Sequence, residues 1–426
     1  MTEKTGDPPV YLDYNATTPL APEVETAVRE SLSLWGNPSS GYKTGERPRE
    51  AVQEARLRVA QMIGAETSEV TFTSGGTESN HLAIWSALAS YRSSLRTEVS
   101  SDCPGGPEDP ACHNSSRGLP HIVTSNIEHP AITAPLAALE REGLCRVTAV
   151  PVVPGAGRWT VQSVLDSITV DTCLVTVMLA NNETGIIQPV GELFSRLRQF
   201  PPQTRAPLIL HTDAAQAVGK VKVDVGELRA DMMTVVGHKF YGPRVGCLYH
   251  RAGVPVTPML YGGGQEAGLR PGTENTPMIV GLGVAADLVR RNIAEYNNHL
   301  RSVRDYLRDQ LIRHFTLVSS DLPVSLARGE ICWRYVDRLT LPNTLSLRFG
   351  GWTGPALLAA CQDHLEASCG AACHTGAGGS STLINSFLWG EVGAAETVRL
   401  SVGRETSRAD IDRVVKALRD ACDRAD

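Results

Sequence analysis

The sequence predicts an α/β protein with a large domain on a mostly parallel, seven-stranded sheet and a smaller α+β C-terminal domain. The chain has 426 residues, too many for one small domain. Between about residues 70 and 250, short apolar runs alternate with polar loops and helix-like segments, as in a sheet covered by helices on both faces. After His250 a Gly- and Pro-rich connection leads into a long helical pattern, which indicates a second domain.

Seven apolar runs are the expected strands of the large domain, which we place at residues 31–275. Several are apolar on both faces, as buried parallel strands are. In chain order they are Val70–Thr73, His121–Ser125, Arg146–Val150, Leu174–Leu179, Leu208–His211, Met232–Val236 and Gly246–Tyr249. A stretch rich in Ser, Pro, Gly and Asp within residues 93–118 predicts a flexible insert between two of these runs.

The smaller domain is expected to span residues 276–426, with residues 1–30 packing against it. Three segments of this domain have the pattern of helices, and two others have the pattern of strands. The expected helices are Met278–His314, Pro355–Leu365 and Arg408–Asp423, and the expected strands are Asn343–Phe349 and Thr397–Val402.

Composition excludes several classes of protein. The net charge is -6 and the pI is about 6.0, so no electrostatic grip on nucleic acid or an anionic membrane is expected. No apolar stretch reaches the roughly 18 residues of a membrane span. The first residues lack an apolar signal region and an Arg-rich amphipathic pattern, and the ten cysteines include no CxxC pair. We therefore expect a cytosolic protein with mostly free thiols and no metal site.

A candidate phosphate site lies where the Val70–Thr73 run leads into a helical segment. Gly76 and Thr77 stand at this junction, where free backbone N–H groups and the helix dipole favour an anion. The glycine lets the backbone approach closely, and the hydroxyl of Thr77 adds a donor. An ordinary Gly-rich turn with a helix cap is the alternative, because short Gly-rich motifs have many false positives.

Two further candidate site residues lie just after neighbouring apolar runs. Asp213, with Gln216 three residues on, follows Leu208–His211, and a carboxylate there would hold a pyridine nitrogen protonated. Lys239 follows Met232–Val236, where partial desolvation would lower its pKa and favour Schiff-base formation. The alternatives are an aspartate that only caps a helix and a lysine that reaches solvent.

Asn182 and His129 complete the set. Asn182 follows an apolar run, where its amide would donate to a ring oxygen, although Asn and Gly are also turn formers. His129 follows His121–Ser125 and would stack on a flat cofactor, although a lone histidine is more often a helix-start or core residue. All five signals lie at the carboxyl ends of expected strands. Together they supply the parts of a site for pyridoxal 5′-phosphate (PLP).

Two cysteines, Cys369 and Cys373, stand in a segment of small and Gly-rich residues from Ala367 to Ser380. Such a segment suits a mobile loop that carries a thiol nucleophile, and the adjacent His374 favours the thiolate. Two alternatives remain open. The cysteines are buried and inert, or they form a metal or iron–sulfur site, for which CxxxC-His without nearby ligands is weak support.

The sequence resembles the NifS-like family of cysteine desulfurases and selenocysteine lyases, within the class V aminotransferase superfamily. The resemblance runs in order from about Tyr11 to the C-terminus. It rests on five motifs, Tyr11–Pro19, Ser74–Asn80, Asn181–Gly185, Asp213–Gln216 and Gly237–Pro243. It implies the PLP-dependent transferase fold of type I and a homodimer.

Within the family, the chain is most similar to the selenocysteine lyase branch. Arg270–Ile279 and Gly370–His374 look like that branch. Val236 stands where desulfurases often have a serine that binds the cofactor phosphate, and it has no side-chain donor. The resemblance therefore implies that the phosphate is held by Gly76, Thr77, His238 and Thr273, with Thr273 reaching across from the partner subunit.

The resemblance also implies roles for the residues around the cofactor ring. Lys239 would form the Schiff base with PLP and move the Cα proton. Asp213 would pair with the pyridine nitrogen, and His129 would stack on the ring and take part in catalysis. Asn182 and Gln216 would contact the ring near its oxygen.

The remaining implied roles concern the substrate. Arg399 would hold the substrate carboxylate bidentately, with Asn15 also in the substrate site. Cys373 would be the loop nucleophile, and Cys369 departs from the family pattern.

The implied reaction converts L-selenocysteine to L-alanine and reduced selenium. The alternative is a cysteine desulfurase that produces alanine and an enzyme-bound persulfide with the same residues. A selenium-accepting protein is a further implied partner.

Overall fold

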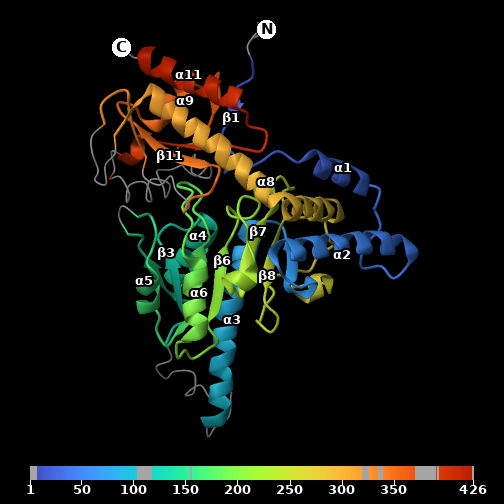
Figure 1. Cartoon of the computed structure of the whole chain (residues 1–426). Coiled ribbons are helices and arrows are strands. Elements are labelled where there is room, and N and C mark those ends of the chain that lie inside the picture. The colour runs from blue at the N-terminus through green and yellow to red at the C-terminus, as the bar shows by residue number, and fades with distance from the viewer. Residues whose placement is uncertain are drawn as a thin grey trace.

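The computed structural model describes residues 7–102, 118–153, 156–318, 326–333, 339–369, 390 and 393–424. A large domain around one central sheet carries a smaller domain at one end, and the long helix α8 (Thr276–His314) runs from one to the other (Figure 1). The first strand β1 (Val10–Tyr11) and the last helix α11 (Arg408–Arg424) both lie at the small domain.

The large domain is built on a seven-stranded sheet of order β2-β8-β7-β6-β5-β3-β4. All strands are parallel except β8, which runs antiparallel to both of its neighbours. The predicted sheet is therefore confirmed, with strand ends within two residues of those expected. The strands are β2 (Val70–Thr73), β3 (His121–Ser125), β4 (Arg146–Val150), β5 (Thr172–Met178), β6 (Ile209–Asp213), β7 (Met232–Val236) and β8 (Gly246–His250).

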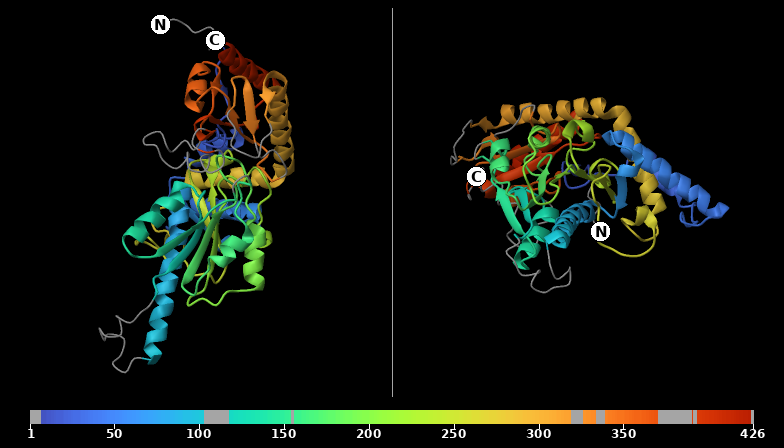
Figure 2. Two further views of the ribbon diagram at one scale, coloured as in Figure 1. Left: turned by 90° about the vertical axis from the view of Figure 1, so that its left-hand side faces the viewer. Right: turned by 90° about the horizontal axis from the view of Figure 1, so that it is seen from below.

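Successive residues of the central strands enter two different cores, because side chains alternate across a strand. Ile122 and Leu174 pack on one face beneath α3 (Gly76–Asp102) and α4 (Pro130–Arg141). Their neighbours Val123 and Val175 pack on the other face, against α6 (Val190–Gln199) and the helices around α2 (Lys43–Ile63). Figure 2 shows helices on both sides of the sheet. This burial on both faces explains why the strands read as continuous apolar runs.

Helix α8 joins the two cores. Its first half, including Leu282 and Ala286, packs in the large-domain core with α2 and α1 (Pro22–Ser31). Its second half, including Leu307 and Leu311, packs in the small-domain core. The helix begins at the domain boundary predicted between residues 275 and 276, yet its first half packs in the large-domain core, and that boundary stays a prediction.

The small domain holds a four-stranded sheet of order β13-β11-β10-β9, covered by α8, α9 and α11. The expected strands and the expected last helix are present. The short strands β9 and β10 were not predicted from the sequence. The elements are β9 (Thr316–Leu317), β10 (Glu330–Trp333), β11 (Thr344–Phe349), α9 (Gly354–Ala360), β13 (Thr397–Ser401) and α11 (Arg408–Arg424).

Two predicted boundaries are wrong. The helix expected to reach Leu365 ends at Ala360, because Leu365 lies in β12 (Leu365–Glu366), which pairs in parallel with β1 (Val10–Tyr11). The insert expected at residues 93–118 is helical up to Asp102, where α3 ends. The rest of that insert lies outside the described residues.

The N-terminal segment contacts both domains. Val10 and Leu12 are buried in the small-domain core, whereas α1 packs against the first half of α8, so the predicted packing of residues 1–30 stays a prediction. No helix in the described part of the chain is long and apolar enough to span a membrane.

Candidate active site

A cavity of about 260 Å³ opens beside the ends of the parallel strands. Loops that follow β2, β3, β5, β6 and β7 reach it, because parallel strands bring their carboxyl ends to one edge of the sheet. Ten of the twelve predicted site residues line it, namely Asn15, Gly76, Thr77, His129, Asn182, Asp213, Gln216, His238, Lys239 and Arg399.

The start of helix α3 forms one wall of this cavity. The N–H groups of Gly76 and Thr77 lie in the first helical turn, where no intrahelical acceptor exists. A Cβ built on Gly76 would lie 2.7 Å from the Cγ2 of Val236, so only glycine fits this close packing. The wall therefore presents backbone donors and the positive end of the helix dipole to the cavity, as an anion site requires.

Asp213 lies in the centre of the site, at the end of β6. Its Oδ2 accepts a hydrogen bond from Asn80 Nδ2 at 2.8 Å, and its Oδ1 accepts from the backbone N–H of Ala215 at 2.9 Å. The residue is 8% exposed, and within the described ranges no basic side chain forms an ion pair with it. A buried carboxylate without a counter-charge is costly, so the site is suited to a cationic group of a ligand.

Lys239 ends the short 3-10 helix η3 (Gly237–Lys239), which follows β7. Its Nζ donates to the backbone oxygens of Asn15 at 2.8 Å and Ala16 at 2.7 Å. The side chain is half-buried and lines the cavity instead of reaching open solvent. The amine is therefore held at the cavity wall by two carbonyl groups.

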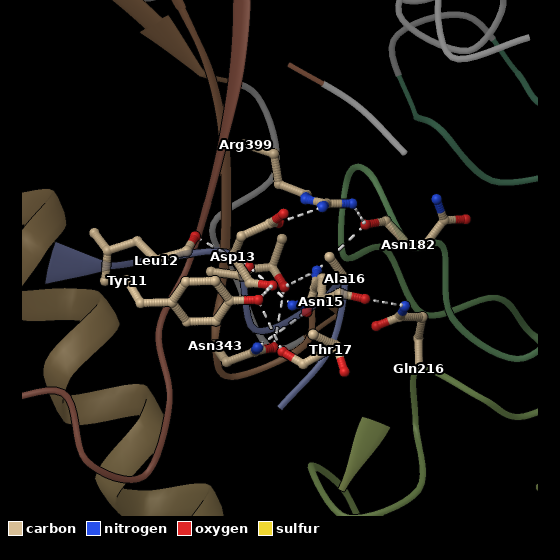
Figure 3. A network of polar contacts seen from close by, with 12 residues as sticks. Tyr11, Leu12, Asp13, Asn15, Ala16, Thr17, Asn182, Gln216, Asn343 and Arg399 are labelled. Carbon is tan, nitrogen blue, oxygen red and sulfur yellow. Dashed lines mark hydrogen bonds and ion pairs between the residues drawn. The ribbon is translucent and has the colours of Figure 1, made fainter. Parts of the chain in front are cut away.

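Asn15 joins the N-terminal segment to both domains (Figure 3). Its Nδ2 donates to Asn182 O at 3.3 Å and to Thr344 Oγ1 at 2.9 Å, and its Oδ1 accepts from Asn343 Nδ2 at 3.0 Å. Its backbone oxygen also accepts from Gln216 Nε2 at 2.9 Å. Asn15 thus fixes the geometry of the cavity wall, and its predicted contact with substrate stays a prediction.

Arg399 projects from β13 of the small domain into the cavity and is 2% exposed. Its Nη2 forms an ion pair with Asp13, and its Nη1 donates to Asn182 O at 2.8 Å. Its buried Nε has no hydrogen-bond partner among the described residues. An arginine with an unused N–H at a cavity wall is suited to bind a carboxylate.

Two histidines, His129 and His238, line the cavity. His129 is the N-cap of α4, and its Nδ1 accepts from the N–H of Ala131 at 3.1 Å. His129 therefore starts a helix and also lines the cavity, and its predicted stacking on the cofactor stays a prediction. Burial, with the neighbouring charges of Lys239 and Arg244, lowers the pKa of His238 to about 4, so its ring is neutral near pH 7.

Thr273 and Cys373 are the two remaining predicted residues. Thr273 is exposed on the loop before α8 and does not line this cavity. Cys373 lies outside the described residues, as does His374 beside it. Cys369 is partly buried, and burial raises its thiol pKa to about 11.

Comparison with known proteins connects this geometry to a family. Residues 10–98 and 114–414 match the family model described as aminotransferase class-V. The chain belongs to the class-V aminotransferase family. Members of this family depend on PLP.

Individual relatives in the family match over almost the whole chain. Selenocysteine lyase of Xenopus tropicalis is 44% identical over 97% of this chain and 93% of its own length. Cysteine desulfurase IscS of Rickettsia akari is 35% identical over 96% of this chain and 90% of its own length. A solved structure of a NifS-like protein superposes with a TM-score of 0.80 at 27% identity, covering 97% of this chain and 98% of the other.

The cavity of this class-V protein fits PLP. The carboxylate of Asp213 has no ion-pair partner among the described residues, and the protonated pyridine nitrogen would supply one. The phosphate would meet the donors of Gly76 and Thr77, and Lys239 stands at the wall as the amine for covalent attachment. The site thus holds the carboxylate, the anion cradle and the amine that PLP binding requires.

Three polar residues of the site were not predicted from the sequence. Asn80 orients Asp213, Asp13 pairs with Arg399, and Lys220 contacts Asn15 and Gln216. Asn80 lies four residues after Gly76 in α3, one helical turn on, so helical spacing was a usable signal. Lys220 gave no such signal, because nothing in the pattern shows that it is buried.

Beneath the site, Glu128 lies between β3 and β5 and is 6% exposed. Ser125 Oγ and the N–H of Met178 both donate to its Oε1, while Oε2 has no partner among the described residues. Burial raises the pKa of Glu128 to about 8, against hydrogen bonds that lower it, and the charge of Asp213 adds to the rise. The side chain is therefore protonated in the folded protein at neutral pH.

Replacing Glu128 by Gln should reduce the pH dependence of stability. Above pH 4.5 the unfolded state releases a proton that the folded state keeps until about pH 8. This group alone therefore lowers the free energy of unfolding by about 1.4 kcal/mol per pH unit in that window. Glu128→Gln cannot ionise, so its stability relative to the parent should increase as pH rises. Urea unfolding of both proteins across the window measures this, and a constant difference would contradict it.

Proposed function

We propose that this protein is a PLP-dependent carbon–selenium lyase that converts L-selenocysteine to L-alanine and reduced selenium. Its 44% identity to selenocysteine lyase over 97% of the chain carries the choice of substrate. The cavity supports it, because Lys239, Asp213 and Arg399 supply the amine, the acid and the carboxylate-binding group.

Different residues of the chain have different roles in this reaction. Arg399 holds the substrate carboxylate, and the amine of Lys239 takes the proton from Cα and returns it. When bound, PLP supplies an electron sink for the charge left on Cα. Asp213 keeps the pyridine nitrogen protonated. Cys373, outside the described residues, acts on the departing selenium.

The overall reaction requires a reductant. The Cβ–Se bond breaks, Cβ gains hydrogen to form the alanine methyl group, and selenium leaves as selenide. Two electrons and two protons enter, which a dithiol supplies as it becomes a disulfide.

A second candidate function is cysteine desulfuration, which produces alanine and a persulfide on the enzyme. The 35% identity to cysteine desulfurase IscS over 96% of the chain favours it as the alternative. Both reactions use the same cavity residues, so the geometry of the site does not separate them.

The substrate is tested by incubating the purified holoenzyme with L-selenocysteine or L-cysteine under reducing conditions and measuring alanine. Much more alanine from selenocysteine supports the proposal. Comparable alanine from both favours the desulfurase, and none from either excludes both functions. A Cys373→Ala variant with full activity would remove the proposed role of the loop thiol.

Replacing Arg399 by Lys should lower kcat/KM for the amino acid about 10- to 100-fold, mainly through KM. Lysine keeps the charge but loses the planar pair of donors that binds a carboxylate bidentately. Arg29→Lys is the matched control, because Arg29 forms an exposed ion pair with Glu25 on α1. Steady-state kinetics of both variants measure the effect, and equal KM values in all three proteins would exclude this role.

The proposal includes a cytosolic homodimer in which Thr273 reaches the cofactor phosphate of the partner subunit. Two observations support this arrangement. Thr273 is exposed and away from the cavity of its own chain, and Arg270 of the same loop is anchored to Glu78 at 2.9 Å. Light scattering tests the dimer, and cell fractionation tests the location. A selenium-accepting protein is a further partner in this proposal.

A further inference from the structure

Lys220 is a buried lysine behind the cavity wall that Asn15 and Gln216 form. Only 4% of its surface is exposed, and its Nζ donates to Asn15 Oδ1 at 2.8 Å and to Gln216 Oε1 at 2.6 Å. Its backbone is also fixed, because its carbonyl oxygen accepts from Asn297 Nδ2 of α8 at 2.9 Å. The amine therefore has a defined position and two defined acceptors.

The partners of Lys220 are suited to a neutral amine. Both are amide oxygens, and no carboxylate of the described residues forms an ion pair with it. A neutral amine has two N–H donors, which match the two acceptors, whereas a buried cation without a counter-charge is costly. Burial, with the nearby charges of Lys239 and Arg399, lowers the pKa of Lys220 well below its usual value.

These contacts fix the orientation of the Gln216 carboxamide. Its Oε1 accepts from Lys220, and one Nε2–H goes to the backbone oxygen of Asn15 at 2.9 Å. A flipped amide would place its NH₂ against the donors of Lys220 and its oxygen against another oxygen. Its second Nε2–H has no acceptor among the described residues, and the side chain lines the cavity. Gln216 therefore offers a donor to the cavity.

Lys220 also helps to hold Asn15. The Oδ1 of Asn15 accepts from both Lys220 and Asn343, and its Nδ2 donates to Asn182 and Thr344. With its side chain held in this way, the backbone oxygen of Asn15 faces Lys239. One buried amine is thus hydrogen-bonded to Gln216 and to Asn15, whose backbone oxygen accepts from Lys239.

We infer that Lys220 is a positioning residue that makes Gln216 present an N–H donor, and not an oxygen, to the ring oxygen of bound PLP. The inference rests on the proposed function only in taking PLP as the cofactor. It holds whether the substrate is selenocysteine or cysteine. Its test therefore measures the absorbance of the bound cofactor and not the rate of the reaction. The result can be interpreted even if selenocysteine is not the substrate.

The test is a pH titration of the visible absorbance of the holoenzyme in the parent, Lys220→Met, Gln216→Ala and the double variant. A donor at the ring oxygen stabilises the more negative, deprotonated form of the Lys239-bound cofactor. Loss of that donor should raise the absorbance midpoint by about one pH unit in each single variant. The double variant should shift no further, because both changes remove one interaction.

Lys222→Met is the matched control, since this lysine is exposed and pairs with Glu227. It should keep the parent midpoint. A parent-like midpoint in Lys220→Met, or additive shifts in the double variant, would overturn the inference. If Lys220→Met does not retain PLP, Lys220→Gln replaces it. That shorter donor should still raise the midpoint, and an unchanged midpoint would overturn the inference in the same way.

Discussion

Replacing Lys239 by Ala should reduce alanine formation by at least about 10³-fold. The variant loses the amine that attaches the cofactor and moves the Cα proton. No described residue replaces it, because Lys220 donates to Asn15 and Gln216 and does not line the cavity. Single-turnover measurements of alanine at saturating PLP give the effect directly.

The control for this result is Lys222→Ala, which removes an exposed lysine. Its alanine formation should equal that of the parent. Parent-like alanine formation by Lys239→Ala would mean that another group moves the Cα proton, and the proposed role of Lys239 would be wrong.

Replacing Asp213 by Asn should lower kcat/KM about 10²- to 10³-fold, because a preorganised charge in a water-excluded site is lost. The shape of the side chain is kept. The change also affects the hydrogen bonds, because Asp213 accepts at both oxygens, from Asn80 and from Ala215. Asparagine offers one oxygen, so one of these donors meets an NH₂ group. The variant should also bind PLP more weakly.

Two measurements check the Asp213 result, namely kcat/KM and the dissociation constant of PLP. Asp166→Asn, on the exposed end of α5 (Val161–Asp166), is the matched control and should leave both unchanged. Parent-like kcat/KM in Asp213→Asn would show that the ring nitrogen does not depend on this carboxylate.

The central sheet could be predicted because its strands are buried on both faces and read as apolar runs. The site followed from the same feature. Asp213, Lys239 and Asn182 each come after such a run, and parallel strands bring their ends together. For these residues, the position in the chain just after a strand was sufficient to predict that they lie in the site.

Residues that act through tertiary contacts could not be predicted in this way. Lys220 meets Asn15 across 205 positions of the chain, and Asn80 meets Asp213 across 133. Nothing local marks Lys220 as buried, and the helical spacing of Asn80 from Gly76 does not identify Asp213 as its partner. The end of α9 is a similar case, because pairing of Leu365 with Val10 competes with helix continuation.

The central claim is that one cavity holds PLP on Lys239, and covalent trapping tests it most directly. The holoenzyme is reduced with borohydride and digested, and the pyridoxyl-modified peptide is identified by mass spectrometry. The account predicts a single modified lysine, Lys239. Modification at another lysine, or a reduced protein without a modified peptide, would contradict it.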